Sequence, residues 1–143
     1  MSAVPAHGRG VLDTSTVILL PQLADPSVLP TEPAITAVTL AELSVGPLLT
    51  DDERERARRQ AHVQQAESDF DPLPFDAASA RAFGRVAASL RRAGRKPAAR
   101  AYDAMIAATA IANDLPLYTC NPSDFAGIDE LQLVPVPVRE RLT

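Results

Sequence analysis

The sequence has no tryptophan, a single cysteine and an aromatic content of 4%. So few aromatic rings argue against a binder of single strands that works by stacking bases on its side chains. The lone Cys120 has no partner for an internal disulfide, as is usual in reducing compartments. No apolar run approaches the ~20 residues that span a bilayer, and the first residues do not resemble a signal peptide. We therefore expect a cytoplasmic protein with no membrane partner.

The sequence also has fewer basic side chains, 14, than acidic ones, 18, so its net charge is −4. This total opposes a nucleic-acid partner, since phosphate binding needs positive potential. The distribution is uneven, however, and five basic residues fall close together: Arg91, Arg92, Arg95, Lys96 and Arg100. Such a run is either a solvated helix end or a basic edge that attracts RNA.

The length of 143 residues fits one domain that spans the whole chain, and the 46% of hydrophobic residues suffices for a core. Residues 1–9 show no periodic pattern, so we expect a flexible N-terminal arm there. Short apolar runs that alternate with helical patterns indicate a parallel sheet covered by helices on both faces. The predicted strands are 10–12, 34–37, 117–119 and 131–136, and the longer predicted helices are 51–70, 76–93 and 102–112.

The helix predicted at 102–112 is apolar on nearly every side and must therefore be buried. Yet Asp103 lies in its first turn. Three further acidic residues occur near the ends of predicted strands or at the start of the following helix: Asp13, Glu42 and Asp124. Because the carboxyl ends of parallel strands meet at one edge, we expect these side chains to converge there.

Each acidic residue also has a simpler interpretation. Asp13 and Asp103 suit helix N-caps, and Glu42 suits a solvated helix face. Asp124 suits an Asx turn or the cap of a one-turn helix. If the four converge, their mutual repulsion calls for a cation, and an all-oxygen site favours Mg²⁺ or Mn²⁺. Such an ion activates water for attack on a phosphodiester.

Several hydroxyl groups near these acids are suited to holding a water molecule or a phosphate oxygen, namely those of Thr14, Ser15 and Thr119. No histidine is placed to act as a base, because His7 lies in the predicted arm and His62 on a polar helix. Cys120 is a poor candidate nucleophile, since nothing near it in the sequence stabilises a thiolate.

The ordered motifs V-L-D-T-S, T-L-A-E-L, Y-D-A-M-I-A-A-T-A and L-Y-T-C-N-P-S-D-F resemble those of the PIN domains of VapC-type toxins. The resemblance runs from Val11 to about Val136. It implies a three-layer α/β/α sandwich with a central, mainly parallel sheet of four to five strands. It also implies a Mg²⁺- or Mn²⁺-dependent endoribonuclease that cleaves structured RNA such as tRNA or rRNA and inhibits translation.

The resemblance further implies that the ion is held by Asp13, Glu42, Asp103 and Asp124. The fourth position varies in such proteins, and Asn121 competes with Asp124 for it. We favour Asp124 because it is charged, with Asn121 as a neighbouring or phosphate contact. The implied partners are a VapB-type antitoxin whose tail blocks the site, a second copy in a homodimer, and a larger assembly with the antitoxin.

Two other interpretations compete with this one. A non-catalytic PIN-like module that only binds RNA or protein is less consistent with four intact acids. A Rossmann-type nucleotide binder is disfavoured because no G-x-G-x-x-G motif follows any predicted strand.

Overall fold

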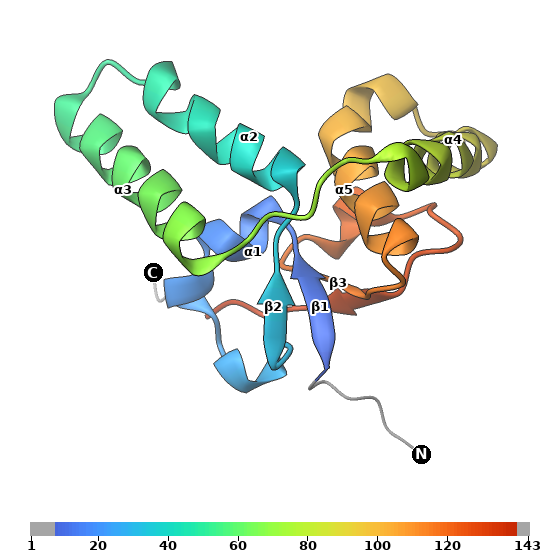
Figure 1. Cartoon of the computed structure of the whole chain (residues 1–143), viewed down its shortest axis with the longest axis horizontal. Helices are drawn as coiled ribbons and strands as arrows, with labels where there is room; N and C mark the ends of the chain where they lie inside the picture. The colour runs from blue at the N-terminus through green and yellow to red at the C-terminus, as the bar shows by residue number, and fades with distance from the viewer. Residues whose placement is uncertain (1–7, 140–143) are drawn as a thin grey trace.

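Four short strands form one parallel sheet at the centre of the computed structural model, which describes residues 8–139 (Figure 1). Their order across the sheet is β2-β1-β3-β4. The strands are β1 (Arg9–Leu12), β2 (Glu32–Ala34), β3 (Leu117–Thr119) and β4 (Leu133–Pro135). All strands run in one direction, so their carboxyl ends share one edge of the sheet.

The two central strands are buried on both faces, which explains their continuous apolar sequences. In β1 the side chains of Val11 and Leu12 are almost inaccessible, and in β3 the same holds for Leu117 and Tyr118. The last strand lies at the edge of the sheet, as its prolines predict, because proline cannot donate a ladder hydrogen bond.

In the described part of the chain, α-helices surround the sheet. They are α1 (Thr14–Ile18), α2 (Ala37–Val45), α3 (Glu53–Asp69), α4 (Ala77–Arg92) and α5 (Ala101–Ala112). Aspartates before three of them, Asp13, Asp52 and Asp76, accept hydrogen bonds from first-turn N–H groups and so define where these helices begin.

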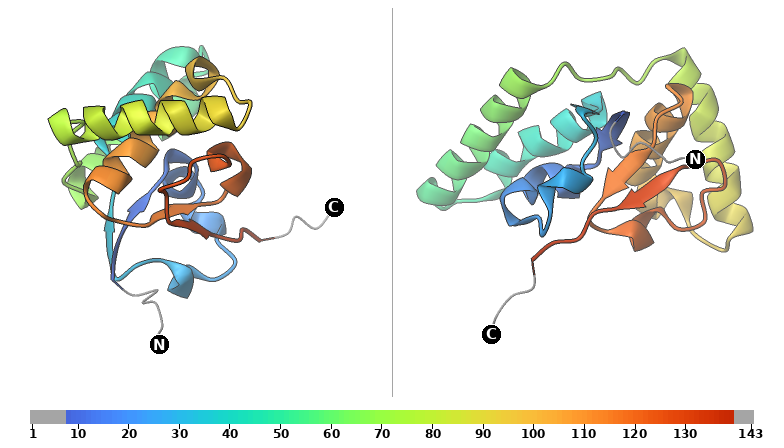
Figure 2. Two further views of the ribbon diagram at one scale, coloured as in Figure 1. Left: turned by 90° about the vertical axis from the view of Figure 1, so that its right-hand side faces the viewer. Right: turned by 90° about the horizontal axis from the view of Figure 1, so that it is seen from below.

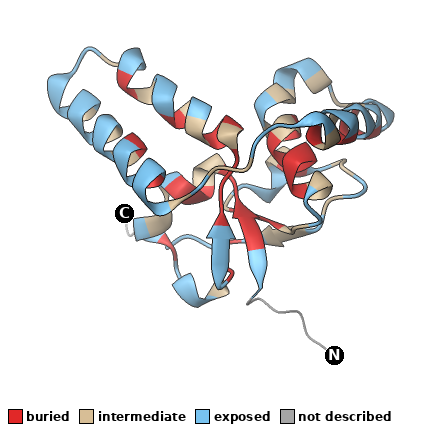
Figure 3. Cartoon of the chain, in the orientation of Figure 1, coloured by how far each residue is buried: buried red, intermediate tan, exposed pale blue. Residues whose placement is uncertain are grey.

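The helices cover both faces of the sheet (Figures 1 and 2). On one face α1, α2 and α3 pack their apolar residues, including Val17, Leu43 and Val63, against Leu12 and Tyr118. On the other face α5 packs against the central strands, and α4 lies against α5. Buried positions therefore face inward on both helical layers, and the outer helix faces are exposed (Figure 3). This arrangement confirms the three-layer α/β/α sandwich with four strands.

Gly10 of β1 lies against the ring of Tyr118. A Cβ atom at this position would come within 2.4 Å of Cε1 of the Tyr118 ring. The pairing of β1 with β3 therefore requires a residue without a side chain at position 10.

The second strand differs from its prediction at 34–37. It ends at Ala34, and Ala37 already belongs to α2. The reason is the side chain of Thr36, which accepts a hydrogen bond from Thr39 N and caps the helix. Thr36 keeps an extended backbone and forms an isolated parallel bridge with Leu73, so the same residue ends the extended segment and caps α2.

The predicted N-terminal arm, residues 1–9, ends too late in the sequence. Arg9 is part of β1, and Gly8 O accepts a hydrogen bond from Glu32 N. Residues 1–7 of that predicted arm lie outside the described residues.

The interpretation of Asp103 as an N-cap is also wrong. Helix α5 begins at Ala101, and the N-cap position belongs to Arg100, which makes no side-chain capping bond. Asp103 is therefore free of that role and lies within the first turn. The buried part of the helix consists of Ala104 and residues 106–110, whereas Tyr102 in the first turn is 58% exposed.

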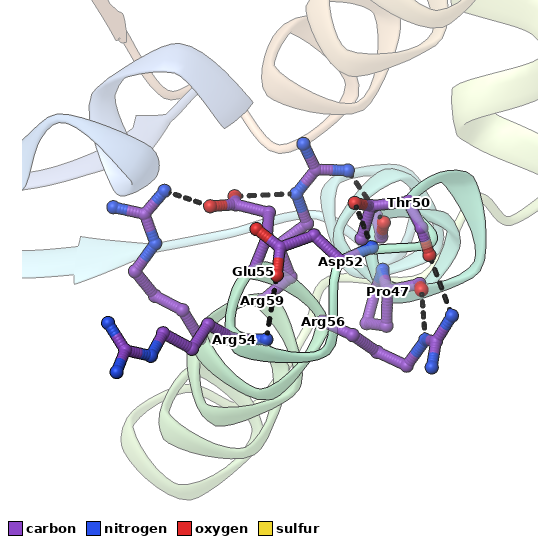
Figure 4. Close-up of polar contacts among 9 residues, drawn as sticks. Pro47, Thr50, Asp52, Arg54, Glu55, Arg56 and Arg59 are labelled. Atoms are coloured by element: carbon purple, nitrogen blue, oxygen red, sulfur yellow. Dashed lines mark hydrogen bonds and ion pairs between the residues drawn. The ribbon is translucent and has the colours of Figure 1, made fainter.

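Helices α2 and α3 form a hairpin whose turn is tied by arginines of α3 (Figure 4). Arg56 donates to the carbonyls of Pro47 and Thr50, and Arg59 donates to the carbonyl of Gly46 at 2.9 Å. Oε2 of Glu55 accepts a 2.8 Å hydrogen bond from Nε of Arg59. These bonds satisfy carbonyls of the connection between α2 and α3 and hold the start of α3 against it.

Candidate functional site

Asp13 is the most deeply buried acidic side chain at the carboxyl-end edge. It follows β1 directly and is only 4% exposed. The Ser15 hydroxyl lies 2.9 Å from each of its oxygens, and Thr16 donates to Oδ1 through both its N–H, at 3.0 Å, and its hydroxyl, at 2.7 Å. From β3, the hydroxyl of Thr119 donates to Oδ2 at 2.7 Å. Such a buried carboxylate, surrounded by donors, is held in one orientation.

Asp13 therefore has two roles, because it also caps α1 as the sequence predicts. The capping bond uses Oδ1. Oδ2 accepts the bond from Thr119 and so faces β3.

Glu42 reaches the same region from α2. Its Oε1 accepts a 2.6 Å hydrogen bond from the hydroxyl of Thr14, which lies 3.0 Å from Oγ1 of Thr39. Burial raises the pKa of the Glu42 carboxyl above its ordinary value, and the charge of Asp13 adds to the increase, while the bond from Thr14 opposes it. The solvated-face interpretation of Glu42 is therefore wrong, because the side chain points inward.

Asp103, in the first turn of α5, is half-buried. Its pKa is raised to about 6, chiefly by burial. The carboxylates of Asp124, Glu42 and Asp13 raise this pKa as well, in that order, and the guanidinium of Arg100 lowers it. The four predicted acidic residues thus lie in one electrostatic neighbourhood, although they come from four separate segments of the chain.

Asp124 lies in a short 3-10 helix, Pro122–Phe125, that follows β3. Its Oδ1 accepts a 3.0 Å bond from Nη1 of Arg100, and both side chains are about one third exposed. Asn121, the competing candidate, is exposed and takes part through its backbone: its N–H donates to Thr119 Oγ1 and its carbonyl accepts from Asp124 N.

The basic run does not form one continuous free edge. Arg92 pairs with Asp129 at 3.1 Å, and Arg95 donates to the carbonyls of Ser123 and Ala126. Arg100 pairs with Asp124, as described above. Arg91 and Lys96 are exposed, and within residues 8–139 no hydrogen bond or ion pair holds their side chains.

The side chains gathered here suit a hard divalent ion, because the atoms they offer as ligands are carboxylate and hydroxyl oxygens. The mutual repulsion that raises the pKa of Asp103 also fits a site that a cation stabilises. Within residues 8–139, however, no three acidic, histidine or cysteine side chains lie close enough to form a ready-made ligand cluster. Binding an ion here would therefore require the carboxylates to move toward it.

A cavity of about 510 Å³ lies beside the acidic site. Thr14 and Glu42 line it. Its other walls come from α1, α2 and α3 and combine apolar side chains such as Ile18 with the polar Arg58 and His62. The exposed Ile18 thus faces this cavity, whereas its neighbour Val17 packs into the core.

Two residues that form hydrogen bonds within the site are missing from the site predicted from the sequence. Thr16 is fully buried and binds Asp13, and the equally buried Thr39 lies against Thr14. The signal for Thr16 is its position three residues after an N-cap aspartate, where the backbone N–H must point back at the cap. Nothing in the sequence marks Thr39, which comes near Thr14 only through packing of α2 on α1.

The surroundings of the Cys120 thiol are consistent with the prediction that it is a poor nucleophile. Burial raises its pKa above the ordinary value, the nearby charge of Asp13 adds to this, and the contact with Thr16 opposes it. The neutral thiol therefore dominates near neutral pH.

The fold and the site together define a class: parallel α/β/α proteins with a group of acidic residues at the carboxyl ends of the central strands. A search of protein families matches residues 11–131 to the PIN domain. The chain is 39% identical over 131 residues to ribonuclease VapC5 of Mycobacterium tuberculosis, covering 90% of this chain and 93% of that protein. It is 30% identical over 106 residues to a ribonuclease VapC of Rickettsia bellii, covering 74% and 78%. The chain belongs to the PIN-domain family, with relatives of the VapC type.

Solved structures agree with this assignment. The crystal structure of VapBC-5, a member of the VapBC family of toxin–antitoxin systems from Mycobacterium tuberculosis, aligns with a TM-score of 0.78 and 36% identity. That alignment covers 90% of this chain and 99% of the other. FitAcB from Neisseria gonorrhoeae aligns with a TM-score of 0.67 and 27% identity over 86% and 94% of the two chains. No helix among the described residues combines the length and apolar character needed to cross a membrane.

Proposed function

We propose that this protein is a metal-dependent endoribonuclease and the toxin of a toxin–antitoxin pair. It cleaves structured RNA, tRNA or rRNA, and thereby inhibits translation. The observation that supports the proposal most directly is the convergence of four carboxylates on Asp103, whose pKa is raised to about 6 partly by the other three. The names of the curated relatives, ribonucleases VapC, supply the class of reaction.

In this proposal Asp13, Glu42, Asp103 and Asp124 hold Mg²⁺ or Mn²⁺. When bound, the ion polarises a phosphoryl oxygen and activates a water molecule for attack on phosphorus. The protein's own contribution is orientation. Ser15, Thr16 and Thr119 fix the carboxylate of Asp13, and Thr14 fixes that of Glu42.

The proposed partners follow from the solved neighbours. VapBC-5 is described as a toxin–antitoxin system, so we propose a VapB-type antitoxin for this chain. We also propose a homodimer that forms a larger assembly with the antitoxin. Co-expression with the product of a neighbouring reading frame, followed by light scattering of the purified complex, tests both. A monomer that does not bind that product would contradict this part.

The experiment that tests the activity uses the purified protein with total tRNA and rRNA, in Mg²⁺ or Mn²⁺ and in EDTA. Asp103→Asn should reduce cleavage to the level without protein, and EDTA should do the same. Asp114→Asn is the matched control, because Asp114 is exposed beyond the other end of α5 and its φ of 55° suits asparagine. Cleavage that survives both Asp103→Asn and EDTA would refute the metal centre.

A second candidate is a PIN-like module that binds RNA or protein without cleaving it. The observation that favours it is that no ready-made ligand cluster exists among residues 8–139. This candidate predicts RNA binding that is equal with and without divalent ions and no new RNA ends. Mapping 5′ ends after expression in cells separates it from the nuclease.

A further inference from the structure

The Arg100–Asp124 ion pair lies among the four acidic residues and competes with the role proposed for Asp124. The Nη1 of Arg100 is 3.0 Å from Oδ1 of Asp124, at hydrogen-bonding distance. Arg100 occupies the N-cap position of α5, three residues before Asp103. One arginine thus places its positive charge beside two of the four candidate metal ligands.

The geometry limits what Asp124 can bind at one time. The bond from Arg100 uses one lone pair of Oδ1 and places a positive charge beside the carboxylate, which reduces what Asp124 offers to a metal ion. A guanidinium and a divalent ion bound to the same carboxylate also repel each other. Both side chains are about one third exposed, so the arginine has a route to solvent.

The loop that carries Asp124 is independently anchored. Arg95 donates to the carbonyls of Ser123 and Ala126, at 3.1 Å each, on either side of Asp124. Asp124 N is bonded to Asn121 O. Release of Arg100 therefore need not displace the loop, because its position depends on other contacts.

We propose that Arg100 is an internal counter-ion of the acidic site, and that a divalent ion displaces its guanidinium from Asp124 on binding. The inference rests on the proposed metal centre. Arg100 is accordingly a positioning residue: it stabilises the crowded carboxylates without the ion and weakens the affinity for the ion. It is not a member of a free RNA-binding edge.

The first test measures Mn²⁺ affinity by calorimetry after treatment with a chelator. Arg100→Gln should bind Mn²⁺ about two- to fivefold more tightly, the range that a partly exposed ion pair contributes to an equilibrium. Arg91→Gln removes the same charge from the end of α4 without touching Asp124, and its affinity should match that of the unmodified protein. If the two variants raise the Mn²⁺ affinity equally, the gain comes only from the change in long-range charge, and the proposal is overturned.

The second test observes the ion pair directly. In nuclear magnetic resonance spectra of the ¹⁵N,¹³C-labelled protein, addition of Mg²⁺ should move the guanidinium signals of Arg100 toward those of a free arginine. The carboxyl carbon of Asp103 reports ion binding separately. A shift at Asp103 with unchanged Arg100 signals would overturn the proposal and leave the metal centre intact. No shift at either residue would refute the metal centre, and the displacement with it.

Discussion

The hydroxyl of Thr119, at the end of β3, donates a 2.7 Å hydrogen bond to Oδ2 of Asp13, at the end of β1. The two residues are 106 positions apart in the chain. This bond joins the two central strands at the carboxyl-end edge and orients the acid that follows the first strand. The position of Asp13 therefore depends on correct pairing of β1 with β3.

Replacing Thr119 with valine should lower both stability and cleavage. Valine keeps the shape but removes a donor to a buried carboxylate, which costs about 1–3 kcal/mol of unfolding free energy. Thr109→Val is the matched control, because Thr109 is equally buried but its hydroxyl binds only the carbonyl of Met105 within α5. Urea denaturation and RNA cleavage measure the two effects. Normal cleavage by Thr119→Val would contradict the role given to the bond.

Asp103→Asn should stabilise the protein at neutral pH in the presence of a chelator. The folded-state pKa of Asp103, about 6, lies above its ordinary value of 3.8, so the folded state binds the proton more tightly. Stability of the unmodified protein therefore falls as the pH rises through this window. The gain from asparagine should be roughly 1 kcal/mol at pH 7.5, after allowance for solvent screening, and should vanish near pH 4. A gain in stability that does not depend on pH would contradict the raised pKa assigned to Asp103.

Binding of Mn²⁺ should weaken as the pH falls below about 6, because a proton on Asp103 competes with the ion. Calorimetry at pH 5 and pH 7.5 measures the change. The same titration on Asp103→Asn should show weak binding with little dependence on pH between these values. Affinity that is constant with pH in the unmodified protein would place the ion elsewhere.

The exposed members of the basic run should contribute to RNA binding. Replacing Arg91 and Lys96 with glutamine should reduce the slope of log affinity against log salt by about 1–2, with no change in melting temperature. Arg95→Gln should instead lower the melting temperature, because it leaves the carbonyls of Ser123 and Ala126 without their donor. An unchanged salt slope in the double variant would place the RNA on another surface.

Gly10→Ala should destabilise the fold by about 1–3 kcal/mol, since its Cβ would overlap the ring of Tyr118. Gly84→Ala is the control, because Gly84 lies in α4 with nothing within 4 Å of an added Cβ. That variant should gain about 0.5–1 kcal/mol from better helix propensity. Thermal unfolding of both variants gives the comparison, and equal effects would exclude the steric explanation.

The sequence predicts the parts of this fold that depend on local pattern. The apolar runs of β1 and β3 predict central strands, and the prolines near Pro135 predict an edge strand. Some of its local predictions are wrong. Thr36 is extended and also caps α2, so the strand ends earlier than predicted, and the N-cap alternative for Asp103 is wrong because Arg100 holds the N-cap position.

The sequence by itself also determined which acidic residues are candidates, because alternating strands and helices bring the ends of parallel strands to one edge. Only the tertiary structure decided their partners: Asp13 with Thr119, Glu42 with Thr14, and Asp124 with Arg100. These pairs join residues far apart in the chain, and hydrogen bonds and ion pairs act over a few ångströms. Strand pairing and helix packing must bring such groups together before their partners, and the pKa of Asp103, are defined.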